Sequence, residues 1–306
     1  MKDLISIIVP IRNVESFINV CLDSLVKQTY ENIEILLIHD NTTDNTIKIC
    51  EYYKKKDKRI KIIIKKTKSI ENKKNIGIDN AKGKYITFVE AGDKITPTFI
   101  KDLYTMIFTY KADIVCTNYY KQNEKPTQRK NTVQVLKGIT IIENYLHMNI
   151  RSHSYAKMFK KTIFDEIKFP DYEIYDDFVT MYKLFHSAKI VIYSELKKYC
   201  LIEEKNQEVS DSDCMRKINA CIDMLNFIET NYPKLLDYCK TKICCEAIDL
   251  FTKVEDKEYK KQLYEYIKLY RKYAIKDLRL TQKMRLKVSK SLFGYNILNF
   301  NMKLEK

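Results

Sequence analysis

Ile5-Ser-Ile-Ile-Val-Pro-Ile-Arg-Asn13 is a β-branched run that stops at a polar turn, and it decides the fold. Such nearly continuous apolar character is typical of a strand that is covered on both faces of a sheet. Similar runs recur at residues 33–38, 59–64 and 85–89, each separated from the one before by a helix-like segment. This alternation predicts right-handed crossovers and a mostly parallel sheet flanked by helices.

The segments around these runs complete the prediction. Asn13 is a candidate N-cap of the first helix, and residues 69–81 fit a later helix. We expect a further strand at residues 113–117, followed by a mobile loop or lid over the polar residues 118–138. After about Val209 the chain has a helical pattern throughout. The apolar face expected for the first helix comprises Phe17, Val20, Cys21 and Leu25.

Polar residues gather where three of the predicted strands end, at residues 10–13, 39–44 and 90–93. In open parallel sheets, ligands bind in the crevice beyond the carboxyl ends of the strands. A single turn rich in Asn, Asp and Thr is usually only a turn. Three strand ends with acidic or amide side chains at the same edge of a sheet indicate a binding site.

The composition limits the class of protein. The chain has 306 residues, 45% of them hydrophobic, and only five glycines and five prolines, which excludes a collagenous or disordered protein. It carries 55 Lys and Arg against 40 Asp and Glu, a formal net charge of +15. This excess favours polyanionic partners such as nucleotides or anionic lipid surfaces, although it is equally consistent with a solvated lysine-rich surface. No nucleic-acid-binding motif is present, so we expect no nucleic-acid partner.

The cysteines and the apolar runs bear on location. Nine cysteines form no CxxC pair and no metal-binding spacing with histidine, which is typical of a reduced cytoplasmic protein. The apolar run at residues 4–9 is too short for a signal core or a membrane span, and no other run reaches membrane length. We therefore expect a cytoplasmic protein that does not cross a bilayer.

Nine segments of the first two-thirds of the chain carry motifs that belong together. They are Ile5–Asn13, Cys21–Tyr30, Asn32–Ile35, His39–Asp44, Lys74–Gly77, Ala81–Val89, Lys157–Lys160, Phe169–Pro170 and Ile174–Asp177. Taken together and in this order, these motifs resemble family 2 glycosyltransferases of the GT-A fold. The resemblance implies a GT-A, Rossmann-like domain at residues 1–208, followed by a helical C-terminal region at residues 209–306.

The resemblance also implies a nucleotide-sugar donor, with UDP-sugars favoured, a divalent metal ion and inversion at the anomeric carbon. Inverting transfer needs a carboxylate base that takes the proton from the acceptor hydroxyl. The family's base corresponds to Asp177, with Asp176 beside it. Read from the residues alone, this acidic pair is also consistent with the N-terminal turn of a helix.

Five further residues correspond to the donor-binding positions of the family. Asp40 matches the residue that contacts the base of the nucleotide, and Pro10 and Asn13 line the same pocket. Lys74 stands in place of an arginine near the phosphates, and Asn75 follows it in the same motif. A lysine is a less specific phosphate ligand than arginine but still supplies a positive point charge.

The metal motif departs from the family pattern. Where the family has Asp-Ser-Asp-Asp, this chain has Glu90-Ala-Gly-Asp93. Glu90 and Asp93 are the candidate ligands of Mg²⁺ or Mn²⁺, and Gly92 replaces the usual direct ligand. Three interpretations follow: an altered but working metal site, weak metal dependence with Lys74 or lid lysines on the diphosphate, or an inactive homologue.

The last segment, residues 278–306, alternates apolar and basic side chains. Such a segment can lie on the anionic inner face of the cell membrane, or it can pack against the helical region as core. The resemblance and this segment together suggest transfer to a glycan or lipid-linked acceptor in the synthesis of cell-surface polysaccharide or lipo-oligosaccharide. The alternative is a non-catalytic GT-A homologue that binds nucleotide sugar or a partner enzyme.

Overall fold

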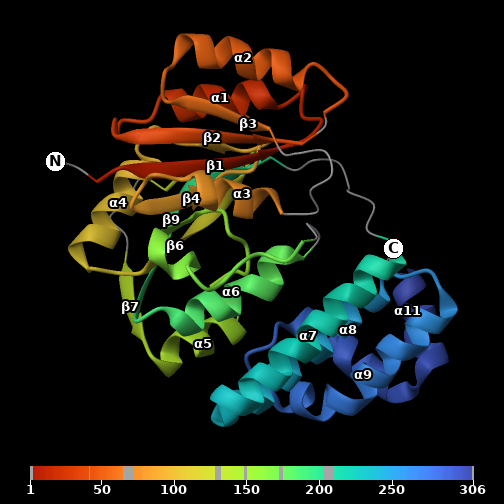
Figure 1. The fold of residues 1–306 in the computed structure, drawn as a ribbon. Coiled ribbons are helices and arrows are strands. Elements are labelled where there is room, and N and C mark those ends of the chain that lie inside the picture. The colour runs from red at the N-terminus through yellow and green to blue at the C-terminus, as the bar shows by residue number, and fades with distance from the viewer. Residues whose placement is uncertain are drawn as a thin grey trace. The chain divides into compact units, whose positions relative to one another are not determined.

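The structure is a computed structural model, and it divides the chain into two compact units (Figure 1). Unit 1 takes in residues 1–142 and 150–206, and unit 2 takes in residues 143–149 and 207–306. The residues that the structure describes are 3–40, 42–64, 72–127, 132–147, 150–171, 175–202 and 210–304.

One sheet forms the centre of unit 1. Its first part contains only parallel neighbours, as predicted, in the order β3-β2-β1-β4. The chain moves outward from β1 to β3 and then returns to the other side of β1, so the strand order reverses there. The bounds of these strands are β1 (Ile5–Ile11), β2 (Ile33–His39), β3 (Ile60–Ile64) and β4 (Tyr85–Phe88).

The second part of the sheet is mixed and continues from β4 in the order β8-β6-β9-β5, with β7 paired to β9. The prediction of a loop over residues 118–138 is wrong at both of its ends, which belong to strands of this part of the sheet. β6 continues through Lys121, and residues 133–137 form β7, because both can pair with the long strand β9. The bounds are β5 (Lys94–Ile95), β6 (Ile114–Lys121), β7 (Val133–Lys137), β8 (Lys157–Lys160) and β9 (Ile190–Leu201).

Helices cover both faces of the sheet. Ile5, Ile7 and Val9 join a core that includes residues of α1 and α4, and α3 packs against β1 and β2. Gly77 allows the close approach of α3, because a Cβ atom there would lie 2.4 Å from Ile8 Cγ2. The bounds are α1 (Ile18–Val26), α2 (Thr46–Lys56), α3 (Lys73–Asn80), α4 (Phe99–Thr109), α5 (Ile139–Leu146), η1 (Lys161–Phe164) and α6 (Asp176–Ser187).

Two details of the predicted helices need correction. Asn13 is not the N-cap of α1, which begins at Ile18 and buries Ile18, Cys21, Leu22 and Leu25. Phe17 and Val20 are exposed rather than on the buried face, because that face runs through Ile18 and the residues three, four and seven positions after it. The predicted helix at residues 69–81 corresponds to α3, and its first three positions lie outside the described residues.

Unit 2 is helical. The predicted break near Pro233 is present, and α8 packs against α7, α9 and α10. Among the described helices, none is long and apolar enough to cross a membrane. The bounds are α7 (Asp211–Asn231), η2 (Pro233–Leu235), α8 (Leu236–Phe251), α9 (Lys257–Lys276), α10 (Gln282–Lys290), η3 (Ser291–Phe293) and α11 (Tyr295–Leu304).

The C-terminal segment has both buried and exposed apolar residues. Val288 and Leu298 are fully buried within unit 2, as core residues would be. Leu286, Leu292 and Phe293 remain exposed, with 57%, 52% and 70% of their surface accessible to solvent. The segment therefore packs through one side and leaves a set of large apolar side chains in contact with water.

Candidate active site

The carboxyl ends of β1 and β2 are joined by their following loops. Asn13 Oδ1 accepts a hydrogen bond of 2.9 Å from the backbone N–H of Thr43, and the N–H of Val14 donates to Thr46 Oγ1 at 3.0 Å. Asn13 itself has a left-handed backbone with φ of 49°, which suits asparagine better than most residues. Asn13, which the sequence predicts to line the nucleotide-sugar pocket, thus fixes the loop after β1 against the loop after β2.

Pro10 and Asp40 lie at the same two strand ends. Pro10 faces Ile38 of β2 in the ladder and is half-buried. Asp40 directly follows β2, and its N–H donates to the carbonyl of Ile11 at 3.4 Å. Its side chain is half-buried. The structure therefore brings Pro10, Asn13 and Asp40 to one edge of the sheet, where parallel α/β folds bind ligands.

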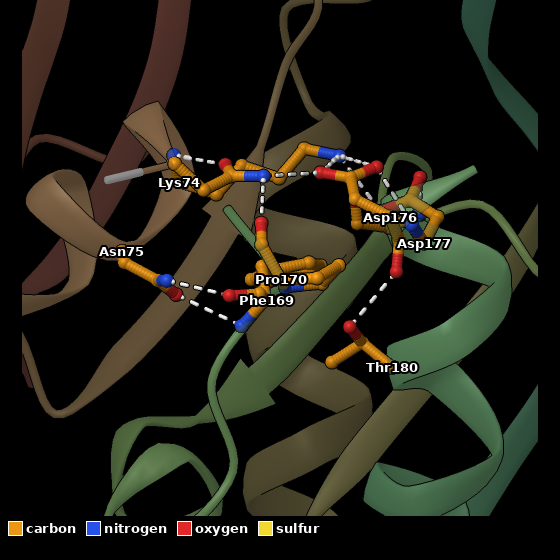
Figure 2. Close-up of polar contacts among 9 residues, drawn as sticks. Lys74, Asn75, Phe169, Pro170, Asp176, Asp177 and Thr180 are labelled. Carbon is orange, nitrogen blue, oxygen red and sulfur yellow. Dashed lines mark hydrogen bonds and ion pairs between the residues drawn. The ribbon is translucent and has the colours of Figure 1, made fainter. Parts of the chain in front are cut away.

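A buried lysine connects α3 with the start of α6 (Figure 2). Lys74 Nζ lies 2.8 Å from Asp177 Oδ1 and 3.1 Å from Asp176 Oδ1, although these residues are about a hundred positions apart in the chain. Burial opposes the charged form of the lysine, but Asp177 and Asp176 outweigh it and raise the pKa of Lys74 well above its usual value. Lys74 is therefore a permanent cation in this site.

The two carboxylates differ electrostatically. Burial is the largest influence on both, and for Asp176 it raises the pKa. For Asp177, the nearby Lys74 cation and the N–H of Ser154, which donates to Oδ2 at 2.8 Å, lower the pKa despite burial. Asp177 is therefore ionised at neutral pH. Asp176 also accepts a 2.9 Å hydrogen bond from Asn72, the N-cap residue of α3.

Asn75 holds the segment that precedes the acidic pair. Its side-chain amide donates to the carbonyl of Phe169 at 2.8 Å and accepts from the N–H of Phe169 at 2.9 Å (Figure 2). Asn72 adds a 3.0 Å hydrogen bond to the carbonyl of Pro170. The buried amide of Asn75 is thus committed to the backbone of Phe169.

Glu90 and Asp93 lie in the turn after β4 but have different surroundings. Asp93 is buried, and both of its carboxylate oxygens accept hydrogen bonds, from the hydroxyl of Tyr199 at 2.6 Å and from the N–H of Ile202 at 2.8 Å. Glu90 is half-buried. Desolvation raises the pKa of Glu90 to about 7, against the influence of Lys74 and reinforced by Asp177. Glu90 therefore shares one electrostatic environment with the acidic pair.

Three of the four non-glycine residues with positive φ in the described part of the chain lie near these side chains, and the fourth, Lys111, follows α4. Besides Asn13, Ala156 and Tyr175 have left-handed conformations, with φ of 55° and 66°. Tyr175 directly precedes Asp176, and Ala156 lies two residues after Ser154. Such conformations cost on the order of 1–3 kcal/mol each and persist where the surrounding structure holds them, often at functional sites.

A metal ion at this site would have few protein ligands. Among the described residues, no group of three or more His, Cys, Asp or Glu side chains is arranged to hold one. Glu90 has a carboxylate to offer, whereas the oxygens of Asp93 already accept hydrogen bonds. One carboxylate is sufficient for magnesium when substrate phosphates and waters complete the coordination.

The sequence did not point to three residues that organise this site: Asn72, Ser154 and Tyr199. An asparagine ahead of a helix is an N-cap signal that could have identified Asn72. Ser154 acts through its backbone N–H, and Tyr199 lies in a tyrosine-rich strand, so neither carries a local signal.

Comparison with known proteins gives a consistent result. Residues 6–170 match the family model described as glycosyl transferase family 2. The chain is 33% identical over 207 residues to glycosyltransferase GlyG of Streptococcus pneumoniae serotype 4, which covers 63% of this chain and 68% of GlyG. It is 32% identical over 211 residues to glycosyltransferase GlyA of the same organism, covering 65% of this chain but only 30% of GlyA.

Solved structures share the fold. S. aureus TarS, residues 1–349 in complex with UDP-GlcNAc, is similar with a TM-score of 0.69 at 17% identity, covering 99% of this chain and 92% of that one. A mannosyltransferase from Pyrobaculum calidifontis, in complex with GDP-Man and Mn2+, has a TM-score of 0.59 at 12% identity, covering 100% and 88%. The predicted GT-A fold with a C-terminal helical region is confirmed.

Proposed function

The chain belongs to glycosyl transferase family 2, and we propose that it transfers a sugar from a UDP-linked donor to a glycan or lipid-linked acceptor, with inversion at the anomeric carbon. The single observation that carries the proposal is the buried contact of Lys74 with Asp176 and Asp177. It sets an ionised carboxylate and a cation side by side, and both groups have a role in the proposed inverting transfer. TarS, which has been solved with UDP and with UDP-GlcNAc, supports the choice of nucleotide.

In this proposal, Asp177 is the base that takes the proton from the acceptor hydroxyl. The proton of the attacking hydroxyl passes to a carboxylate oxygen while the sugar moves to the acceptor oxygen and the nucleoside diphosphate leaves. Asp176 and the N–H of Ser154 hold Asp177 in place. A base works best when its pKa is near the working pH, and the Lys74 contact keeps that of Asp177 low. Transfer of Lys74 from Asp177 to the donor would therefore strengthen the base.

The donor is proposed to bind at the strand ends. Asp40 contacts the nucleotide base, Pro10 and Asn13 line the pocket, and Lys74 faces the diphosphate. Glu90 would hold a divalent cation together with the phosphates, and a cation so bound stabilises the charge that develops on the leaving diphosphate. The catalytic domain comprises residues 1–208, and residues 209–306 form the accessory helical region.

Exchange of Asp177 for asparagine tests the base. Asp177→Asn should reduce transfer by at least about 100-fold, because general base catalysis contributes that much or more. Donor affinity, measured by calorimetry, should change by less than about threefold. The matched control is Asp165→Asn, the same exchange at an exposed carboxylate of unit 1. Full turnover by the Asp177 variant would refute the assignment.

A donor panel tests the reaction class. Calorimetric titration with UDP-, GDP- and CMP-sugars, with and without Mn²⁺, should show binding of a UDP-sugar and slow hydrolysis of the bound donor. Absence of binding to every donor would refute the donor site. Binding without hydrolysis or transfer would favour the non-catalytic alternative.

We also propose that the C-terminal segment contacts an anionic membrane surface, which would suit a lipid-linked acceptor. Leu292 and Phe293 are exposed in η3, and Lys283 and Arg285 precede them in α10. In such segments, apolar side chains enter the membrane interface while basic side chains are attracted to anionic lipid headgroups. A Leu292→Ser, Phe293→Ser variant should bind phosphatidylglycerol vesicles at least about tenfold more weakly, since burial of one such side chain contributes about 1.5–3 kcal/mol. Ile64→Ser, at an equally exposed position of unit 1, should have no effect.

A further inference from the structure

The phenol of Tyr199 holds the turn that carries Glu90. Its oxygen accepts a 3.0 Å hydrogen bond from the backbone N–H of Glu90 and donates at 2.6 Å to Asp93 Oδ2. The turn closes on itself through a 2.9 Å bond from the N–H of Asp93 to the carbonyl of Glu90. One hydroxyl therefore bridges both ends of the turn after β4.

Tyr199 is itself held in place by packing. It is fully buried in β9, and its ring stacks on Tyr155 with centroids 5.0 Å apart. It also packs edge-to-face with Phe99, with centroids 5.9 Å apart. Tyr155 in turn stacks under His153 at 4.6 Å. Burial and the nearby Lys157 cation lower the pKa of His153 to about 4, so this ring is neutral at pH 7.

The same column of rings leads to the acidic pair. His153 precedes Ser154, whose N–H donates to Asp177, and the buried Lys157 Nζ fixes the carbonyl of His153 at 2.6 Å. The segment that supports Asp177 and the turn that carries Glu90 are therefore connected through Tyr155 and Tyr199.

We propose that Tyr199 is a positioning residue for the cation and diphosphate site: it engages Asp93 so that Glu90 alone presents a carboxylate to the ligand. This inference rests on the proposed function. It assigns different roles to Glu90 and Asp93, which the sequence presents as equivalent candidate metal ligands. Asp93 serves as the anchor of the turn. Glu90 receives its orientation from Tyr199 through its backbone.

Exchange of tyrosine for phenylalanine at two positions tests the proposal. Tyr199→Phe keeps the ring stack but removes the hydroxyl that bridges Glu90 and Asp93. Tyr155→Phe makes the same chemical change in the adjacent ring, whose hydroxyl does not take part in the hydrogen bonds that join Glu90, Tyr199 and Asp93. UDP and a UDP-sugar are titrated by calorimetry into each protein, with and without Mn²⁺, and amide exchange of residues 89–93 is followed by mass spectrometry.

The Tyr199 variant should lose about tenfold in the Mn²⁺-dependent part of the affinity, as expected for a lost hydrogen bond to a charged group. Its affinity without Mn²⁺ should stay unchanged, and residues 89–93 should exchange faster. The Tyr155 variant should behave as the wild type. Equal affinities for wild type and Tyr199→Phe, or equal losses in both variants, would overturn the proposal. A wild type that binds no donor would instead refute the proposed function, and exchange at residues 89–93 would still report whether Tyr199 holds the turn.

Discussion

Removal of the Lys74 charge is the sharpest test of the site. In Lys74→Met the side chain keeps a similar length, but Asp176 and Asp177 lose the cation between them. Their side chains are 6% and 15% exposed and that of Lys74 is 9% exposed, so water cannot replace it easily. At the observed distances of 2.8 and 3.1 Å, the two attractions are about 6 and about 5 kcal/mol for an effective dielectric constant of about 20.

The desolvation of three charges offsets much of this attraction, so the net effect is smaller. Removing one partner of a buried ion pair typically costs about 3–5 kcal/mol. That is a large fraction of the about 5–15 kcal/mol that stabilises a typical protein. We therefore expect Lys74→Met to lower the free energy of unfolding by about 3–5 kcal/mol at pH 8.

The loss should depend on pH in a defined direction. Without the cation, burial raises the pKa of both carboxyl groups above their unfolded values, so the folded state binds more protons than the unfolded state. Stability then falls as pH rises through the folded pKa values. As pH falls toward the unfolded pKa of about 3.9, the two buried groups of the variant become protonated, and its stability should move toward that of the wild type.

Urea unfolding of unit 1, followed by circular dichroism between pH 4 and pH 8, measures this effect. The control is Lys84→Met, because Lys84 makes an exposed ion pair with Asp3 at 3.0 Å. An exposed pair contributes about 0–1 kcal/mol. A Lys74→Met variant as stable as this control at pH 8, or one whose loss does not vary with pH, would refute the reasoning.

Three further predictions follow from single contacts. Glu90→Gln should be more stable than the wild type above pH 7 by about 1–3 kcal/mol. The reason is that the wild type loses stability as pH rises from about 4.5 to about 7 through the raised pKa of Glu90. Calorimetry should also show that the variant has lost Mn²⁺-dependent donor binding. Gly83→Ala should cost about 1–3 kcal/mol in urea unfolding, because its Cβ would lie 2.6 Å from the backbone nitrogen of Ser6. Asn75→Asp should lower the free energy of unfolding by about 3 kcal/mol at pH 8, because a buried carboxylate would face the carbonyl of Phe169. A loss of stability that vanished at pH 8 rather than at low pH would contradict this reason.

The fold was predictable because its signals are local. The run at residues 5–13 is apolar on both sides of the strand, which only a sheet covered by helices can bury. The prediction failed where a segment's state depends on a distant partner. Residues 133–137 lie in a stretch, 118–138, whose overall polar character suggests a loop, but their backbone pairs with Ile190–Ser194 of β9. Asn13 is a residue type that often caps helices, yet its side chain accepts a hydrogen bond from Thr43 in the loop after β2.

The sequence by itself determined the family, the mostly parallel sheet and the residues that gather at the strand ends, because periodicity and motif spacing are properties of the chain itself. Only the tertiary structure decided how these residues are used. It paired Lys74 with Asp176 and Asp177 and assigned Asn75 to the backbone of Phe169. It also placed the Tyr199 hydroxyl between the backbone N–H of Glu90 and the carboxylate of Asp93. The physical reason is that hydrogen bonds and ion pairs act over about 3 Å. Packing of distant segments, rather than their position in the sequence, determines which groups come that close.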